Sequence, residues 1–146
     1  MLKALVRILS GVALVGIGYV AGRSTLPEAR LEAAQGARVF ELRTYTTHEG
    51  KLDALHARFR NHTKRLFERH GMTNVGYWVP QDAPGSGNTL IYVIAHKSRD
   101  AAKQNWDGFR NDPEWQKAKA ESEAAGPIVN KVDSVFMNAV DYSPIK

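Results

Sequence analysis

The order in which strand-like and helix-like patterns follow one another from residue 38 onward most restricts how this chain can fold. Short runs of strand type occupy residues 38–46, 73–79, 89–96 and 131–142. Two longer segments, after the first and the third of these runs, repeat apolar residues at helical spacing. The resulting βαββαβ order predicts an α+β ferredoxin-like fold, which is a four-stranded antiparallel sheet with two helices on one face.

Boundary residues support both helical segments. Thr46 and Glu49 form a capping box that predicts the start of the first helix, and Gly71 predicts its end. Ser98 is the expected cap of the second helix, and Asp112, which a proline follows, predicts that a helix restarts there. The sheet-facing stripe of the first helix is expected to consist of Leu52, Leu55, Phe59, His62 and Leu66.

Two helices on one side leave the other face of the predicted sheet bare. An exposed apolar face of this size needs a cover. A second copy of the same sheet is the simplest cover, because a twofold axis brings identical surfaces together. The sequence therefore predicts a homodimer in which two sheets enclose a lumen, a dimeric α/β barrel.

The first predicted strand carries an acid and a base among apolar residues. Phe40 and Leu42 are expected to face the helices, so that Glu41, Arg43 and Tyr45 would face the lumen. A carboxylate, a guanidinium and a phenol on one wall of a cavity suit a ligand with an anionic or carbonyl group. The alternative is a structural ion pair that fixes the strand register or crosses to the second subunit.

Three further residues are candidates for the same binding site. His62, on the predicted stripe of the first helix, is either a base or haem ligand or a satisfied histidine at the edge of the core. His96 ends the third strand on the face of Tyr92, where it either reaches the mouth of the lumen or is only a polar strand end. Trp78 or its neighbour Tyr77 must face the lumen, and aromatic surface there suits a flat ligand as well as a dimer core.

Composition and motif spacing exclude several functions. The net charge of +5 is too small to indicate nucleic-acid binding, and a chain without cysteine has no thiolate metal site or cysteine nucleophile. Histidine spacings and the PGSG loop match no metal or phosphate motif, so the sequence predicts no metal and no cofactor. The first helix has a basic side, which is either a solvated surface or attracted to anionic lipid headgroups. This side consists of Arg58, Arg60, Lys64, Arg65 and Arg69.

Residues 1–22 have the character of a targeting segment. Lys3 and Arg7 precede an uncharged, largely apolar run. We expect a signal anchor that tethers the chain to a membrane, with the domain outside the cytoplasm on the periplasmic side of a bacterium. The alternatives are a cleaved signal peptide, which leaves the domain secreted or periplasmic, and a mitochondrial presequence. Residues 23–37 are expected to be a linker, and residues 38–146 the domain.

Four segments of the predicted domain resemble the NIPSNAP family. They are FELRTYTTHEGKLDALHARF at 40–59, FERHGMTNVGYW at 67–78, NTLIYVIAHKSRDAA at 88–102 and NDPEWQKAKAESEA at 111–124. The resemblance implies a ferredoxin-like fold, dimeric pairing and, for animal members, a mitochondrial role in protein interaction and mitophagy signalling. It implies no particular catalytic residues.

Two functions are compatible with these predictions. The preferred one is a membrane-tethered dimeric module without catalysis, which binds a protein partner or a small hydrophobic or anionic ligand and in which Glu41 pairs with Arg43. The alternative, by analogy with related dimeric α/β barrels, is a cofactor-independent monooxygenase or a haem-handling enzyme. That enzyme would need an open lumen with His62 or His96 near Arg43, and fold analogy alone is a weak basis for chemistry.

Overall fold

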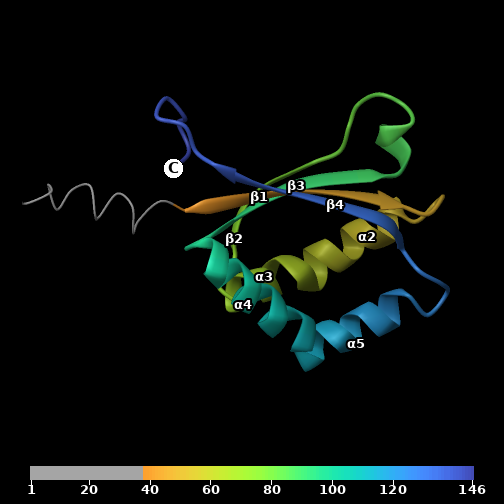
Figure 1. The fold of residues 1–146 in the computed structure, drawn as a ribbon. Coiled ribbons are helices and arrows are strands. Elements are labelled where there is room, and N and C mark those ends of the chain that lie inside the picture. Colours follow the sequence, from red (N-terminus) through yellow and green to blue (C-terminus); the bar gives the residue numbers. More distant parts are fainter. Residues whose placement is uncertain (1–37) are drawn as a thin grey trace, which may run out of the picture.

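The computed structural model describes residues 38–146, and it confirms the predicted order of elements (Figure 1). The strands are β1 (Val39–Thr47), β2 (Thr73–Trp78), β3 (Thr89–His96) and β4 (Val129–Asn138). The helical elements are α2 (Leu52–Arg58), the π-helical turn η1 (Phe59–Thr63), α3 (Lys64–Arg69), the short 3-10 turn η2 (Gly85–Gly87), α4 (Arg99–Asn111) and α5 (Pro113–Ser122). The expected segments 1–22 and 23–37 lie outside the described residues.

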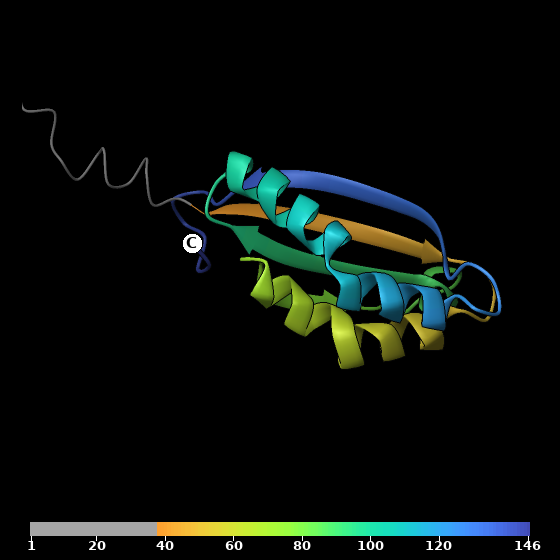
Figure 2. The same cartoon turned by 90° about the horizontal axis from the view of Figure 1, so that it is seen from below.

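The four strands form one antiparallel sheet in the order β2-β3-β1-β4. All of the α-helices cover the same face of this sheet, as the views from the side and from below show (Figures 1 and 2). The predicted α+β ferredoxin-like architecture is therefore confirmed, with β3 and β1 central and β2 and β4 at the edges. Within residues 38–146, no helix combines the length and the apolar character needed to cross a bilayer.

The core lies between the sheet and the helices and is rich in aromatic rings. Phe59 of η1 packs edge-on against Tyr92 of β3 at 5.2 Å between ring centroids, and Phe67 of α3 lies 5.4 Å from Trp106 of α4. The aliphatic side chains that complete this layer are fully buried. They include Leu55, Leu66, Met72, Leu90, Ile94 and Ile128.

The faces of β1 are reversed relative to the prediction. Tyr45 contacts Phe59 on the helix side at 6.1 Å, whereas Phe40 lies on the opposite face and pairs in register with Met137. The sequence pattern divides a strand into two sets of residues but does not say which set faces inward. The polar set with Glu41 and Arg43 faces the helix layer because that layer supplies hydrogen-bond partners. The apolar set with Phe40 and Leu42 is therefore left on the uncovered side.

Two of the three predicted helix starts are confirmed. Ser98 Oγ accepts a hydrogen bond from the Ala101 amide at 3.0 Å, and Asp112 Oδ1 accepts one from the Glu114 amide at 2.8 Å. The capping box at Thr46 is wrong, because β1 continues through this residue and α2 begins only at Leu52. The turn between them passes through Gly50, whose φ of +69° places it in the left-handed region.

Strand β4 ends at Asn138, four residues before the predicted end at 142. The segment 139–146, referred to below as the C-terminal segment, turns back over the uncovered face of the sheet (Figure 1). Phe40 is only 6% exposed although it lies on that face, because this segment lies against it.

Candidate functional site

Glu41 is the centre of a buried polar cluster between the sheet and α4. The indole Nε1 of Trp106 donates a hydrogen bond to Oε2 at 2.7 Å, and the Ser134 hydroxyl on β4 donates one to Oε1 at 2.7 Å. The Arg43 guanidinium is paired with Oε1 at 2.7 Å, and His96 Nε2 lies 3.1 Å from Oε2. The Glu41 side chain is 1% exposed, so its charge is stabilised by the Arg43 guanidinium and by hydrogen bonds with the other three partners.

The position of Asn105 fixes which nitrogen of His96 carries the proton. The Asn105 amide Nδ2 donates to the Gly71 carbonyl at 3.1 Å and lies 3.2 Å from His96 Nδ1. Because Nδ2 is only a donor, His96 Nδ1 must accept, and the ring proton is on Nε2. This tautomer donates from Nε2 to Glu41, so His96 has no free nitrogen with which to act as a base.

The pKa of Glu41 reflects two opposed effects. Burial of the carboxyl group by itself would raise its pKa. The hydrogen bonds from His96, Ser134 and Trp106, together with the charge of Arg43, outweigh burial and lower the pKa from 4.5 to about 2. Glu41 is therefore a carboxylate at neutral pH and not a proton donor.

Arg43 and Tyr45 belong to the same layer. The Arg43 guanidinium carbon lies 4.2 Å from the centroid of the Trp106 ring and 5.5 Å from that of Tyr45. The Tyr45 ring lies 5.3 Å from Tyr92. Of the six predicted site residues, Glu41, Arg43, Tyr45 and His96 thus lie together on the helix side of the sheet, and not on the face predicted to form a lumen.

His62 does not join this cluster, and the reason is the π-helical turn η1 in which it lies. In η1 the Lys64 amide bonds to the Phe59 carbonyl, five residues back, so this turn holds one residue more than an α-helical turn. Thr63 therefore takes the buried, inward position that α-helical spacing had assigned to His62. His62 instead lines a surface groove against α5, beside Ala118.

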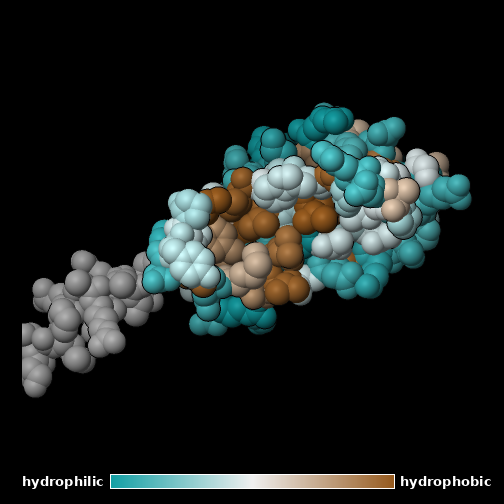
Figure 3. All heavy atoms as spheres, turned by 90° about the horizontal axis from the view of Figure 1, so that it is seen from above, coloured by the Kyte–Doolittle hydropathy of each residue, from teal (hydrophilic) through white to brown (hydrophobic). Residues whose placement is uncertain are grey.

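Trp78 lies on the uncovered side of the sheet, which we call the open face, and is 53% exposed. Val135 on β4 is 55% exposed on the same face, where it pairs in register with Leu42. Figure 3 looks onto the open face and shows hydrophobic side chains gathered across it, with hydrophilic residues toward the rim. Its apolar residues are Phe40, Leu42, Val75, Trp78, Ile91, Val93, Val135 and Met137.

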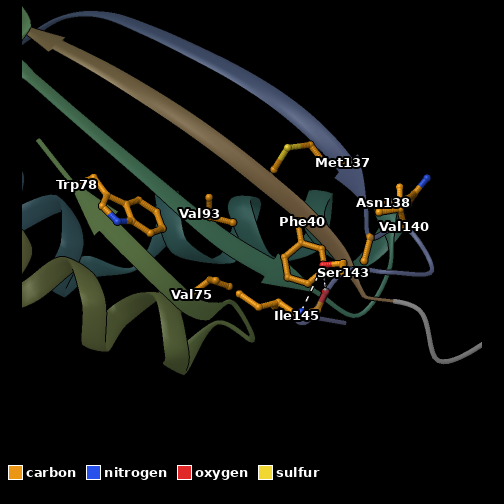
Figure 4. A pocket seen from close by; sticks show the side chains of 10 residues that line it. Phe40, Val75, Trp78, Val93, Met137, Asn138, Val140, Ser143 and Ile145 are labelled. Carbon is orange, nitrogen blue, oxygen red and sulfur yellow. Dashed lines mark hydrogen bonds between the residues drawn. The ribbon is translucent and has the colours of Figure 1, made fainter. Parts of the chain in front are cut away.

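A pocket of about 290 Å³ opens at the end of the open face that the C-terminal segment covers (Figure 4). Phe40 and Val93 lie on its sheet side, and Ile145 lies opposite, beside Val75. A turn holds Ile145 in place, since its amide donates to the Ser143 hydroxyl at 3.3 Å and that hydroxyl donates to the Ile145 carbonyl at 2.7 Å. The lining is almost entirely apolar, which suits a small hydrophobic ligand.

Sequence reasoning missed three members of the buried cluster. Trp106 was not among the predicted site residues, although a buried indole N–H needs an acceptor, and this need could have directed attention to Glu41. Asn105 and Ser134 carry no comparable indication, because polar residues at exposed-looking positions of a helix and an edge strand are common. Within residues 38–146, no three histidine, aspartate or glutamate side chains are close enough together to hold a metal ion.

The antiparallel sheet, with helices on one side and an apolar open face on the other, defines the class of the domain as ferredoxin-like α+β. The NIPSNAP family model matches residues 40–144, and the chain belongs to the NIPSNAP family. No curated protein sequence matches the chain closely enough to be counted as a relative.

Solved structures with the same fold are distant in sequence. A NIPSNAP family protein of unknown function from Agrobacterium tumefaciens is 19% identical with a TM-score of 0.64, and the match covers 75% of this chain and 95% of that one. An uncharacterised NIPSNAP-like domain protein from Burkholderia xenovorans is 14% identical with a TM-score of 0.64, over 74% and 90% of the two chains. SnoaB, a cofactor-independent oxygenase from Streptomyces nogalater, is 15% identical with a TM-score of 0.50, over 75% and 99%. At these identities the likeness establishes the fold alone.

Proposed function

We propose that this protein is a homodimeric binding module in which two open faces pack against each other and enclose the pocket beneath each C-terminal segment. The observation that carries the proposal is the open face itself, where Trp78 and Val135 are more than half exposed in a single chain. Sheets that pack face to face lie about 10 Å apart and bury their facing side chains. A second copy would remove this apolar surface from water, and the lined pocket would receive a small hydrophobic ligand.

The buried cluster supports a module without catalysis. Both oxygens of Glu41 are occupied by donors, and both nitrogens of His96 are engaged. A general base needs a free lone pair within reach of a substrate proton, which this arrangement does not offer. The likeness to SnoaB concerns the fold, so we do not extend its oxygenase activity to this chain.

Residues 1–22 are proposed to tether the dimer to a membrane, with the domain outside the cytoplasm. The support is the sequence alone, an apolar run that follows two basic residues. Extraction of cell membranes at alkaline pH tests the tether, because an anchored chain stays in the pellet and a chain that lacks residues 1–22 is released.

A pair of substitutions on β4 tests the dimer. Val135 lies on the open face and Val132 on the helix side of the same strand, and both are exposed, at 55% and 42%. Val135→Glu places a charge in the proposed interface, where an unpaired charge is costly. Val132→Glu places the same charge in solvent and serves as the matched control.

The molar mass of the detergent-solubilised full chain is measured by light scattering during gel filtration. We expect a dimer for the native chain and for Val132→Glu, and a monomer for Val135→Glu. A native monomer, or a Val135→Glu variant that stays dimeric, contradicts the pairing of open faces.

A further inference from the structure

A second groove, of about 280 Å³, lies at the opposite edge of the domain from β4, between β2 and the helix formed by α2, η1 and α3. It belongs to neither the buried cluster nor the pocket beneath the C-terminal segment. Its lining residues are His56, Phe59, Arg60, Lys64, Tyr77, Trp78, Val79 and Leu90.

The floor of this groove is aromatic and rigid. Tyr77 is stacked on Tyr92 at 5.5 Å and lies 5.7 Å from Phe59, so its ring is fixed by the core. Trp78 borders the groove from the next position on β2, although its indole lies over Gly76 on the open face. Flat apolar surface is therefore held in place before any ligand arrives, which reduces the entropy lost on binding.

The rim of the groove carries Arg60 and Lys64, the two basic residues of the first helix that pair with no acid among residues 38–146. Arg58 is buried against Glu123 at 2.8 Å, and both Arg65 and Arg69 pair with Glu114. Among the described residues, no carboxylate oxygen lies within 4 Å of the Arg60 or Lys64 side-chain nitrogens. Of the five residues on the predicted basic side, Arg60 and Lys64 are thus the two that pair with no acid among residues 38–146. Both of them border this groove.

Hydrogen bonds fix the cationic rim relative to the aromatic floor. Asn74 on β2 donates to the Lys64 carbonyl at 3.1 Å and to Glu68 at 2.8 Å, and it accepts from the Tyr77 hydroxyl. The Lys64 ammonium lies 5.9 Å from the centre of the Tyr77 ring. Asn74 therefore links β2 to α3 beside the Lys64 ammonium and the Tyr77 ring.

We propose that this groove binds a small planar anion, an aromatic carboxylate or a compound of the same chemistry. The ring would lie on Tyr77, and the carboxylate would lie between Arg60 and Lys64. Tyr77, Arg60 and Lys64 lie on the helix side of the sheet and not on the open face that the proposed dimer would bury, so either proposal can fail while the other stands.

The three tryptophans of the chain allow a direct test, because each indole N–H reports on a different place. Trp78 lines the groove, Trp106 contacts Glu41, and Trp115 packs on Phe109. The full chain is labelled with ¹⁵N-tryptophan, placed in phosphatidylcholine nanodiscs and titrated with 4-(trifluoromethyl)benzoate. The amide of the same ring, 4-(trifluoromethyl)benzamide, is the uncharged control ligand.

We expect the acid to shift the Trp78 signal in a saturable manner while the Trp106 and Trp115 signals stay in place. The double variant Arg60→Gln/Lys64→Gln should weaken binding roughly tenfold, because two charge contacts are lost. Lys103→Gln, which changes a cation in a groove beside α4, should leave the affinity within about twofold.

Three results would overturn the proposal. They are no saturable shift at millimolar acid, equal binding of the acid and its amide, and an affinity that Arg60→Gln/Lys64→Gln does not change. Equal binding of acid and amide would assign the ring to the apolar open face, where the Trp78 indole lies.

Discussion

At the scale of single residues, Glu41 shows how a charged side chain can be fully buried in a domain of this size. Its four partners come from β1, β3, β4 and α4, so one carboxylate connects three strands and a helix. Such a group stabilises the fold only while every partner is in place, because an unmatched buried donor is costly.

Glu41→Gln keeps the shape of the side chain and removes its charge. The new amide group turns a donor toward groups that already donate, so we expect the free energy of unfolding to fall by about 3 kcal/mol. Urea denaturation with an unchanged m-value measures this loss. Glu121→Gln, at an exposed glutamate on α5, is the control and should change stability by less than about 0.5 kcal/mol. A loss for Glu41→Gln no larger than that of the control would contradict the role given to the cluster.

The same residue makes stability depend on pH in a definite direction. The pKa of Glu41 is about 2 in the folded chain and 4.5 without its partners. A lowered folded pKa stabilises the fold above pH 4.5, and this stabilisation is lost as the pH falls through 4.5 toward 2. The difference in unfolding free energy between the native chain and Glu41→Gln should therefore shrink by about 2 kcal/mol between pH 6 and pH 3. A difference that stays constant over this range would mean that the carboxyl titrates alike in both states.

Which side chains occupy which face of β1 could not be predicted from the sequence. The alternation of Phe40, Glu41, Leu42 and Arg43 correctly predicted which residues share a face of the strand. The predicted ion pair between Glu41 and Arg43 is also present. The inward direction depends on whether the helix layer supplies donors, and Trp106 does so from 65 residues away. No local pattern in β1 contains that information.

At the scale of elements, local chemistry predicted most of the fold. Apolar spacing and the caps at Ser98 and Asp112 placed β1, β2, β3 and two helices correctly, whereas the last strand was predicted to run four residues too far. The first helix was harder to predict for two reasons. Its start at Leu52 uses no side-chain cap, and the π-helical turn shifts the register so that Thr63 rather than His62 is buried. Neither feature has a sequence pattern that separates it from an ordinary helix.

Asp112 stabilises the start of α5 in two ways that can be measured separately, as a helix cap and as a charged partner of His70 and Arg69. It caps α5 through the Glu114 amide, and its other oxygen is 2.7 Å from His70 Nε2 and 3.3 Å from Arg69. The hydrogen bond with His70 is the main cause that lowers the pKa of Asp112 to about 2.

Replacing Asp112 in two ways separates the cap from the charge. Asp112→Ala removes both and should lower the free energy of unfolding by about 2 kcal/mol, whereas Asp112→Asn keeps a good cap and should recover about 1 kcal/mol of that loss. Chemical denaturation of both variants under one set of conditions gives the comparison. If asparagine is no better than alanine, the cap contributes little and the contact with His70 accounts for the whole effect.

At the scale of the whole molecule, the open face is the feature that the single chain leaves unexplained. Helices cover one side of the sheet, the C-terminal segment covers part of the other, and the remaining apolar surface includes Trp78 and Val135. The sequence predicted a bare face from the order of its elements, but not the pocket beneath the C-terminal segment, because that region was assigned to the last strand.

The pairing of open faces is the central claim, and a distance between two spin labels tests it most directly. The chain has no cysteine, so Asp107→Cys on the exposed side of α4 gives one labelled site per chain. In the proposed dimer, two helix layers and two sheets separate the labels, and three layer spacings of about 10 Å put them at least about 30 Å apart. Electron–electron double resonance on the full chain in detergent should therefore show a dipolar signal at that distance or longer. A distance below about 20 Å would mean that the helices pair instead, and a sample without dipolar signal would mean that the chain is a monomer. Either result would contradict the account.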